Sequence, residues 1–159
     1  MSESTLPTLY EWAGGTPEIF EHLTTVFYDK VLRDELLYPV FKDMSPEHTK
    51  HVAHFIAEVF GGPKLYTGTD GGSHPSMSAR HFGKMLDDTK RKRWVQLLLE
   101  AADETGLPAD PEFRSAFVAY LEWGSRIAVL NSEKPLGADP GNAPMPAWGW
   151  GETKGPYRP

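Results

Sequence analysis

Residues 110–128 read DPEFRSAFVAYLEWGSRIA, and this stretch decides the fold class. Its apolar and small residues recur every three or four positions, at Phe113, Ala116, Phe117, Tyr120, Leu121, Gly124, Ile127 and Ala128. This spacing places them on one face of an α-helix, whereas a half-buried strand would alternate at every second residue. The stretch therefore predicts a long amphipathic helix.

The start of this helix carries a signature that occurs three times in the chain. A capping residue, a proline and a glutamate follow one another at Thr16-Pro17-Glu18, Ser45-Pro46-Glu47 and Asp110-Pro111-Glu112. The capping oxygen can accept a free N–H, proline fits the first turn, and the acid faces the positive end of the helix dipole. We therefore expect helices to begin at Pro17, Pro46 and Pro111.

Further segments show the same periodicity and complete the expected helices. Apolar residues are spaced helically over residues 17–32 and 89–102, and a short helix is expected around residues 75–82. The glycine pair in Gly61-Gly62-Pro63 ends the Pro46 helix. Because neither a strand pattern nor an internal repeat is recognisable, the sequence predicts an all-α fold.

Composition limits the classes of protein to which the chain can belong. The 159 residues include no cysteine, which excludes disulfide scaffolds, thiolate zinc sites, thiol nucleophiles and thioether-attached haem. Sixteen Lys and Arg stand against 22 Asp and Glu, and the net charge of −6 argues against nucleic acid as a partner. The basic cluster at residues 90–93 is interpreted as a solvated helix start. Neither a membrane span nor a signal peptide is recognisable, so we expect a cytoplasmic protein without membrane contact.

The two ends differ in composition from the middle. We expect an N-terminal extension over residues 1–8, one domain over residues 9–132 and a mostly irregular tail over residues 133–159. The tail contains six prolines and five glycines, which prevent a sustained helix or central strand. Trp148, Trp150 and Tyr157 are unusual for a linker. They would dock on the domain or on a partner, although partial disorder is the simpler expectation.

The Pro46 helix carries the first candidate for chemistry. At about 100° per residue, His48 shares one narrow stripe with Val52 and Phe55, while His51 lies on the flank and His54 points away. On spacing alone, a histidine hydrogen-bonded to backbone or water is the simplest interpretation of His48. A zinc site of the three histidines is disfavoured, because they fan over roughly 120° and helical zinc pairs use i and i+4.

Three other side chains stand out less by themselves. Tyr28 and Trp94 are aromatic residues with polar tips on apolar helix faces, where a bond to a backbone carbonyl would satisfy them. His81 lies in Arg80-His81-Phe82 without a distinguishing pattern. No Ser–His–acid spacing or carboxylate pair accompanies these residues.

Taken in order, these residues and their spacings resemble the truncated haemoglobins, and within them the group II branch. The resemblance extends from about Leu9 to Ser132. It rests on a series of motifs that are weak singly and specific together: Phe27-Tyr28, Phe41 before the Pro46 helix, Phe60-Gly61-Gly62-Pro63 with Tyr66 three residues on, His74-Pro75, Arg80-His81, Trp94 after Arg93, and Tyr120-Leu121-Glu122.

The resemblance implies a two-over-two helical sandwich around haem b. The sandwiched pairs would be the Pro17 and Pro46 helices, and the Trp94 and Pro111 helices. His81 matches the proximal iron ligand, which would donate its other ring N–H to a carbonyl near Met77. The other matching positions fall into three groups: Tyr28, His48 and Trp94 around a bound diatomic ligand; Phe41, Val52, Phe55 and Met77 against the porphyrin; and His51, Tyr66 and Arg80 near the propionates.

One departure from the family pattern concerns Phe41. Many group II relatives have a hydroxyl at this position, so one expected hydrogen-bond donor is missing, and His48 is the candidate to replace it. A direct bond from His48 to ferric iron is a second role open to this residue.

The resemblance leaves three functions to compare. The first is reversible binding of dioxygen, and of NO, CO, sulfide or cyanide, with slow release caused by the distal donors. The second is a peroxidase or nitric oxide dioxygenase on the same scaffold, and the third is a haem-free helical module. An unidentified reductase is an implied partner, and a homodimer is compatible with the sequence.

Overall fold

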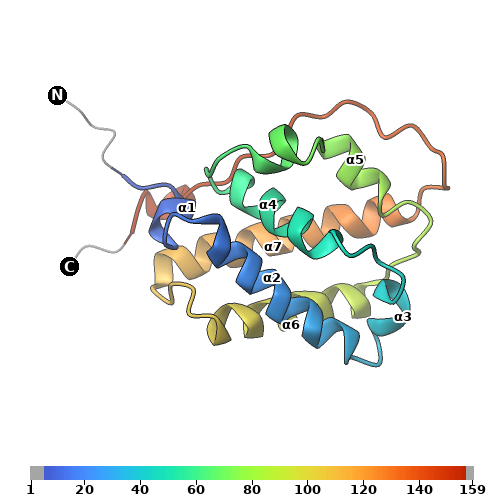
Figure 1. Cartoon of the computed structure of the whole chain (residues 1–159), viewed down its shortest axis with the longest axis horizontal. Helices are drawn as coiled ribbons and strands as arrows, with labels where there is room; N and C mark the ends of the chain where they lie inside the picture. Colours follow the sequence, from blue (N-terminus) through green and yellow to red (C-terminus); the bar gives the residue numbers. More distant parts are fainter. Residues whose placement is uncertain (1–5, 157–159) are drawn as a thin grey trace.

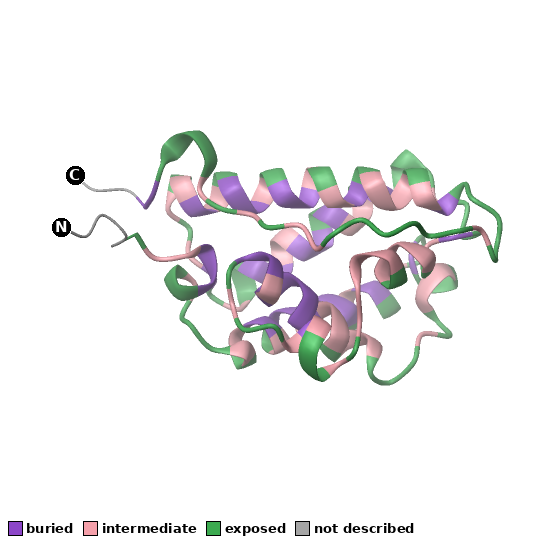
Figure 2. Ribbon diagram, turned by 90° about the horizontal axis from the view of Figure 1, so that it is seen from above, coloured by how far each residue is buried: buried purple, intermediate pink, exposed green. Residues whose placement is uncertain are grey.

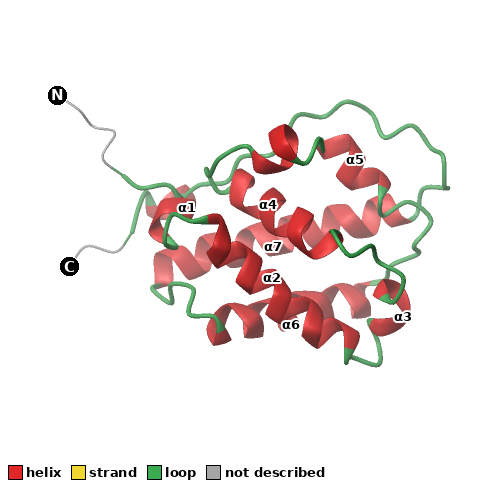
Figure 3. Cartoon of the chain, viewed as in Figure 1, coloured by secondary structure: helices red, strands yellow, loops and turns green. Residues whose placement is uncertain are grey.

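The structure is a computed structural model, and it describes residues 6–156 of the chain. Within this range no strand occurs, and helices alternate with turns and loops (Figure 3). The elements are α1 (Leu9–Trp12), α2 (Pro17–Leu32), α3 (Tyr38–Phe41), α4 (His48–Val59), η1 (Leu65–Thr69), α5 (His74–Ala79), α6 (Asp88–Glu104), α7 (Pro111–Ser132) and η2 (Gly151–Thr153). The expected all-α class is confirmed. None of the helices in residues 6–156 is long and apolar enough to cross a membrane.

The four long helices pack as two crossed pairs. Helix α2 packs against both α4 and α6, and α6 packs against α7. Figure 1 shows α7 running along the molecule behind α2. This arrangement is the two-over-two sandwich, with α2 and α4 as one pair and α6 and α7 as the other.

The three proline signatures do not all work in the same way. Asp110 caps α7 as expected, since its carboxylate accepts the Phe113 N–H at 3.0 Å. Thr16 precedes α2 but its side chain makes no capping bond. Helix α4 begins at His48, two residues later than predicted, because residues 45–47 form a turn in which the Ser45 carbonyl accepts the His48 N–H at 3.0 Å. The proline signature therefore locates a helix start only to within a turn.

The short helix α5 ends earlier than predicted, so that His81 lies in the turns that follow the helix. Ser73 caps α5 in a reciprocal arrangement with Ser76, and the helix stops at Ala79. The next residues form turns, so His81 lies just beyond the helix. Helix α6 then begins at Asp88, capped by Asp87, which accepts the Lys90 N–H at 2.8 Å.

A cluster of aromatic rings fills the core at the end of α4. Phe60 is fully buried and meets Phe20, Phe113 and Tyr120 edge-on at centroid distances of 6.1, 6.5 and 5.4 Å. Gly62 allows the chain to turn closely here, because a Cβ atom would lie 2.8 Å from the Ala57 carbonyl oxygen. The core cluster extends from these rings to Tyr28 and Phe55, which border the cavity that His81 also lines.

The tail after α7 docks on the domain. The sequence analysis had favoured partial disorder over docking. The tail has no regular secondary structure over most of its length, and it runs alongside α7 (Figure 2). The Trp148 N–H donates to the Val59 carbonyl at 2.9 Å, and its indole N–H donates to the Ala116 carbonyl at 3.1 Å. The Trp150 indole donates to the Pro7 carbonyl at 2.8 Å. Tyr157 and residues 1–5 lie outside the described residues.

Candidate functional site

A cavity with a mostly apolar wall opens inside the sandwich, with about 1100 Å³ of empty space including its mouth. Cavities between the helices of a bundle are common sites for small molecules and cofactors. Eight of the eleven residues expected at the site line it: Tyr28, Phe41, His48, Val52, Phe55, Met77, His81 and Trp94. The fold therefore brings together residues from five helices and from the turn after α5.

His81, which the sequence analysis predicts as the iron ligand, lines the cavity. Burial lowers the pKa of its imidazole, while the Met77 carbonyl, one turn earlier, raises that pKa to a lesser extent. The ring is therefore neutral near pH 7, as a metal ligand must be. Its buried Nδ1 atom has no hydrogen-bond partner in this structure, so donation from His81 to the Met77 carbonyl stays a prediction.

The loop that follows His81 is held by the start of the tail. The Gly83 N–H donates to the Lys134 carbonyl at 2.7 Å. The Ser132 carbonyl accepts the Met85 N–H at 3.2 Å, and the Ser132 hydroxyl accepts the Leu86 N–H at 2.9 Å. These bonds tie the loop that carries the metal-binding candidate to the end of α7, and nothing in the sequence pattern indicated them.

Tyr28 and His48 form a hydrogen-bonded pair in the cavity. The Tyr28 hydroxyl and His48 Nε2 are 3.0 Å apart, and the rings meet edge-on. Burial raises the pKa of Tyr28, so its hydroxyl keeps its proton. Burial, assisted by the positive charge of Arg80, lowers the pKa of His48 to about 4. The pair is therefore uncharged near neutral pH, and the His48 tautomer decides which residue donates.

Trp94 and Phe41 complete this side of the cavity. The Trp94 ring is held edge-on to Phe27 with centroids 5.4 Å apart, and the Phe41 ring lies 5.7 Å from that of Tyr28. The Trp94 indole N–H makes no hydrogen bond to any residue in the range 6–156. It is therefore a donor available to a molecule in the cavity.

Cationic and imidazole side chains surround His48 near the cavity. Arg80, His51 and Lys84 each act on His48 closely enough to lower its pKa further. Arg80 and Lys84 are exposed, and neither forms an ion pair with a described residue. Such a group of side chains favours an anionic substituent at this position. His51, Arg80 and Lys84 do not line the cavity itself, so the predicted role of His51 and Arg80 stays a prediction.

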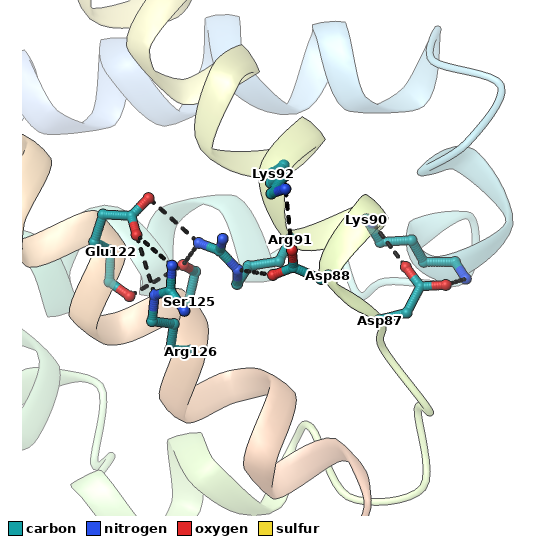
Figure 4. A network of polar contacts seen from close by, with 8 residues as sticks. All are labelled: Asp87, Asp88, Lys90, Arg91, Lys92, Glu122, Ser125 and Arg126. Atoms are coloured by element: carbon teal, nitrogen blue, oxygen red, sulfur yellow. Dashed lines mark hydrogen bonds and ion pairs between the residues drawn. The ribbon is translucent and has the colours of Figure 1, made fainter.

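Arg91 corrects the interpretation of residues 90–93 as a solvated helix start. Its side chain is only 5% exposed and lines the cavity. Figure 4 shows Arg91 reaching from α6 to Glu122 and Ser125 on α7, at 3.3 Å each, while its Nε donates to Asp88 at 2.7 Å. This network joins the two helices beside the cavity wall. Because both carboxylates are partly exposed, water screens their attraction to the guanidinium.

Tyr66 and His54 are engaged elsewhere. Tyr66 is fully buried outside the cavity wall, with its hydroxyl 3.2 Å from Ser76 Oγ. His54 points away from His48 and lies between Asp70 and Glu21, at 2.7 and 2.8 Å. Among residues 6–156, no three His, Asp or Glu side chains form a cluster that could hold a metal ion.

The cavity also contains aromatic and imidazole side chains that the sequence analysis did not assign to the site. Tyr120, Trp123 and His74 line it. His74 stacks on Phe55 at a centroid distance of 6.4 Å, and its buried Nδ1 has no hydrogen-bond partner. The helical spacing of residues 113–128 had placed Tyr120 on the buried face, but it could not show that part of that face borders a cavity.

Comparison with known proteins gives consistent matches. The family model described as bacterial-like globin matches residues 8–123. Group 2 truncated hemoglobin YjbI of Bacillus subtilis is 30% identical over 116 residues, which cover 73% of this chain and 85% of the relative. Group 1 truncated hemoglobin GlbN of Nostoc sp. is 35% identical over 107 residues, covering 66% of this chain and 84% of the relative.

Solved structures show the same similarity in three dimensions. The group II truncated hemoglobin of Bacillus anthracis superposes with a TM-score of 0.68 and 28% identity, covering 81% of this chain and 93% of that one. The truncated oxygen-avid haemoglobin of Bacillus subtilis gives a TM-score of 0.66 and 29% identity, with 77% and 99% covered. The thermostable hemoglobin of Thermobifida fusca gives 0.66 and 29%, with 77% and 97% covered.

Proposed function

Since the chain belongs to the bacterial-like globin family, and within it to the group II truncated haemoglobins, we propose that it binds dioxygen reversibly at haem b and releases it slowly. Haem-based ligand binding follows from the family, whereas the choice of ligand, the slow release and the residue roles are the proposal. Carbon monoxide, nitric oxide, sulfide and cyanide are further ligands for the same site.

The observation that carries the proposal is a half-buried imidazole, neutral near pH 7, in the same cavity as three side chains with polar tips, Tyr28, His48 and Trp94. Haem supplies an iron with an open coordination position when a single histidine holds it. In this chain His81 would be that histidine, because it matches the proximal position of the family, and it is neutral and lines the cavity. Phe41, Val52 and Met77 would pack against the porphyrin, since they form apolar parts of the same wall.

The distal residues would slow ligand release by hydrogen bonding. Trp94 offers its indole N–H, and Tyr28 offers its hydroxyl whenever His48 donates to the tyrosine oxygen instead of accepting from it. A hydrogen bond to a charged group contributes about 1.5–3 kcal/mol. Two such bonds would slow release by roughly 10² to 10⁴-fold, since about 1.4 kcal/mol corresponds to a factor of ten.

The side chains around His48 would bind the propionates. Arg80 and Lys84 are the proposed charged contacts, with His51, because all three act electrostatically on His48, which lines the cavity. Tyr66 is the weakest of the expected propionate contacts, since its hydroxyl is engaged by Ser76. Its proposed role is instead to support α5, the helix that precedes His81.

A second candidate function is reduction of peroxides, and a specific observation favours it over nitric oxide dioxygenase activity. Two oxidisable side chains, Tyr120 and Trp123, border the cavity in addition to the distal donors. A rate of peroxide turnover no higher than that of free haem would exclude this candidate. Either redox function would also need a reductase or another electron donor as partner.

Absorption spectra of the purified protein loaded with haem test the proposal. We expect a Soret band, a ferrous form that binds carbon monoxide, and dioxygen release slower in the wild type than in a Tyr28→Phe, Trp94→Phe double variant. Absence of haem binding would refute the cofactor assignment. Equal release rates in the two proteins would refute the role of the distal donors while leaving haem binding intact.

A further inference from the structure

We propose that Trp123 is a surface oxidation site, at which small phenols give up electrons to a peroxide that is reduced in the cavity. The inference rests on the proposed haem site, and it adds a second place where a substrate binds. Three observations support it: the position of Trp123 between the cavity and the surface, the aromatic rings in contact with it, and the access of water to its indole N–H.

Trp123 reaches from the cavity to the surface. It lines the cavity, and 37% of its surface is exposed. Tyr120, one turn earlier on α7, also lines the cavity, with its ring centroid 6.3 Å from that of Trp123. Trp148 from the docked tail lies 5.5 Å from both rings. The three rings form a contiguous cluster, here called the aromatic triad, that links the cavity to solvent.

The triad members differ in how they could lose a proton after losing an electron. Tyr120 is buried, which raises the pKa of its hydroxyl, so this proton is not readily lost. The Trp148 indole N–H is bonded to the Ala116 carbonyl, which is a poor base. Trp123 makes no side-chain hydrogen bond within residues 6–156 and is open to water. Water can therefore take the indole proton of Trp123, and the oxidised residue in the triad is Trp123.

The proposed step balances in electrons and atoms. Reduction of a hydroperoxide, ROOH + 2H⁺ + 2e⁻ → ROH + H₂O, needs two electrons. Bound haem would supply one of them, and Trp123 supplies the other and loses its indole proton to water. Two phenols then each give one electron and one proton, which restore Trp123 and the iron. The sum is ROOH + 2PhOH → ROH + H₂O + 2PhO•.

The surface around Trp123 favours a neutral aromatic donor. Its neighbour Glu122 pairs with Arg126 at 3.1 Å and with the buried Arg91 at 3.3 Å, so the carboxylate is compensated. An exposed indole offers a flat apolar face on which a phenol ring can stack. A small neutral phenol such as guaiacol is therefore the probe for this site.

Trp12 provides an internal control for the test. It is 39% exposed, nearly the same as Trp123, but it does not line the cavity and packs on Trp150 instead. Its indole N–H donates to the Asp110 carboxylate at 2.8 Å, so Trp12 has a proton acceptor and lacks only the contact with the cavity. The haem-loaded protein is treated with hydrogen peroxide without a phenol, digested and analysed by mass spectrometry. We expect added oxygen on Trp123 and none above background on Trp12. In the haem-free protein we expect equal, low oxidation of both.

Variants give a second readout on the same loaded protein. Trp123→Phe is expected to abolish the tryptophan-radical signal in electron paramagnetic resonance and to lower the rate of guaiacol oxidation, whereas Trp12→Phe changes neither. Equal oxidation of Trp12 and Trp123, or a radical signal that survives Trp123→Phe, would overturn the inference. A missing Soret band would instead refute the proposed function, so the two failures are distinguishable.

Discussion

Replacing Trp94 by phenylalanine tests the distal hydrogen bonds most directly. The Trp94 indole N–H is not bonded to any described residue, whereas the Tyr28 hydroxyl is engaged with His48 at 3.0 Å. A ligand in the cavity can therefore accept from Trp94 without breaking a bond within the protein. Tyr28 can donate to a ligand only when His48 is the tautomer that donates to the tyrosine oxygen. Its hydrogen bond to a ligand therefore competes with its hydrogen bond to His48.

The magnitude follows from what the substitution removes. Phenylalanine keeps a ring in contact with Phe27 and removes the N–H together with part of the ring. The loss of one hydrogen bond to a charged ligand costs about 1.5–3 kcal/mol. That corresponds to dioxygen release roughly 10- to 150-fold faster. We expect Tyr28→Phe to have a smaller effect, because it also frees His48 to donate to the ligand.

Stopped-flow displacement of dioxygen by carbon monoxide measures the release rate. Trp12→Phe is the control, since it removes an indole that lies outside the cavity wall and donates to Asp110 at the start of α7. We expect the control to release dioxygen at the wild-type rate. An unchanged rate in Trp94→Phe would refute the reasoning and would transfer the stabilising role to Tyr28 or His48.

Three further predictions concern the proximal ligand, pH and the tail. His81→Ala should abolish stoichiometric haem binding in a haem titration, and unchanged spectra would exclude His81 as the ligand. Unfolding of the haem-free protein by urea should become easier as the pH falls from 6.5 toward about 4, because the unfolded chain binds a proton on His48 that the folded chain does not. This contributes no more than about 3 kcal/mol, reduced by solvent screening, and His48→Gln should flatten the dependence. Trp148→Ala should lower the unfolding free energy by at least about 2 kcal/mol, through lost packing and an unpaired carbonyl, whereas exposed Leu136→Ala should change it by less than about 0.5 kcal/mol. Equal effects of these two substitutions would contradict the docking of the tail.

Periodicity predicted the long helices well, because a helix is a local structure whose buried face repeats every three or four residues. Their ends were less predictable. Helix α4 begins at His48 and not at Pro46, since a backbone turn takes the place of the side-chain cap. The early end of α5 was also missed, although it decides that His81 lies on a turn.

The site residues divide in a similar way. The spacing of His48 within an apolar stripe was visible in the sequence, and the order of motifs identified Tyr28, His81 and Trp94 as candidates that line one cavity. The burial of Arg91 was not visible, because its partners Glu122 and Ser125 lie more than thirty residues away on α7.

By itself, the sequence determined the helical class, the family and most of the residues around the cavity, because these depend on local periodicity and on the order of a few side chains. Only the tertiary structure decided that Tyr28 bonds to His48, that Tyr66 turns to Ser76, and that Trp148 covers α7 beside Trp123. The physical reason is that hydrogen bonds and ring contacts depend on distances between segments far apart in the chain, which no local pattern encodes.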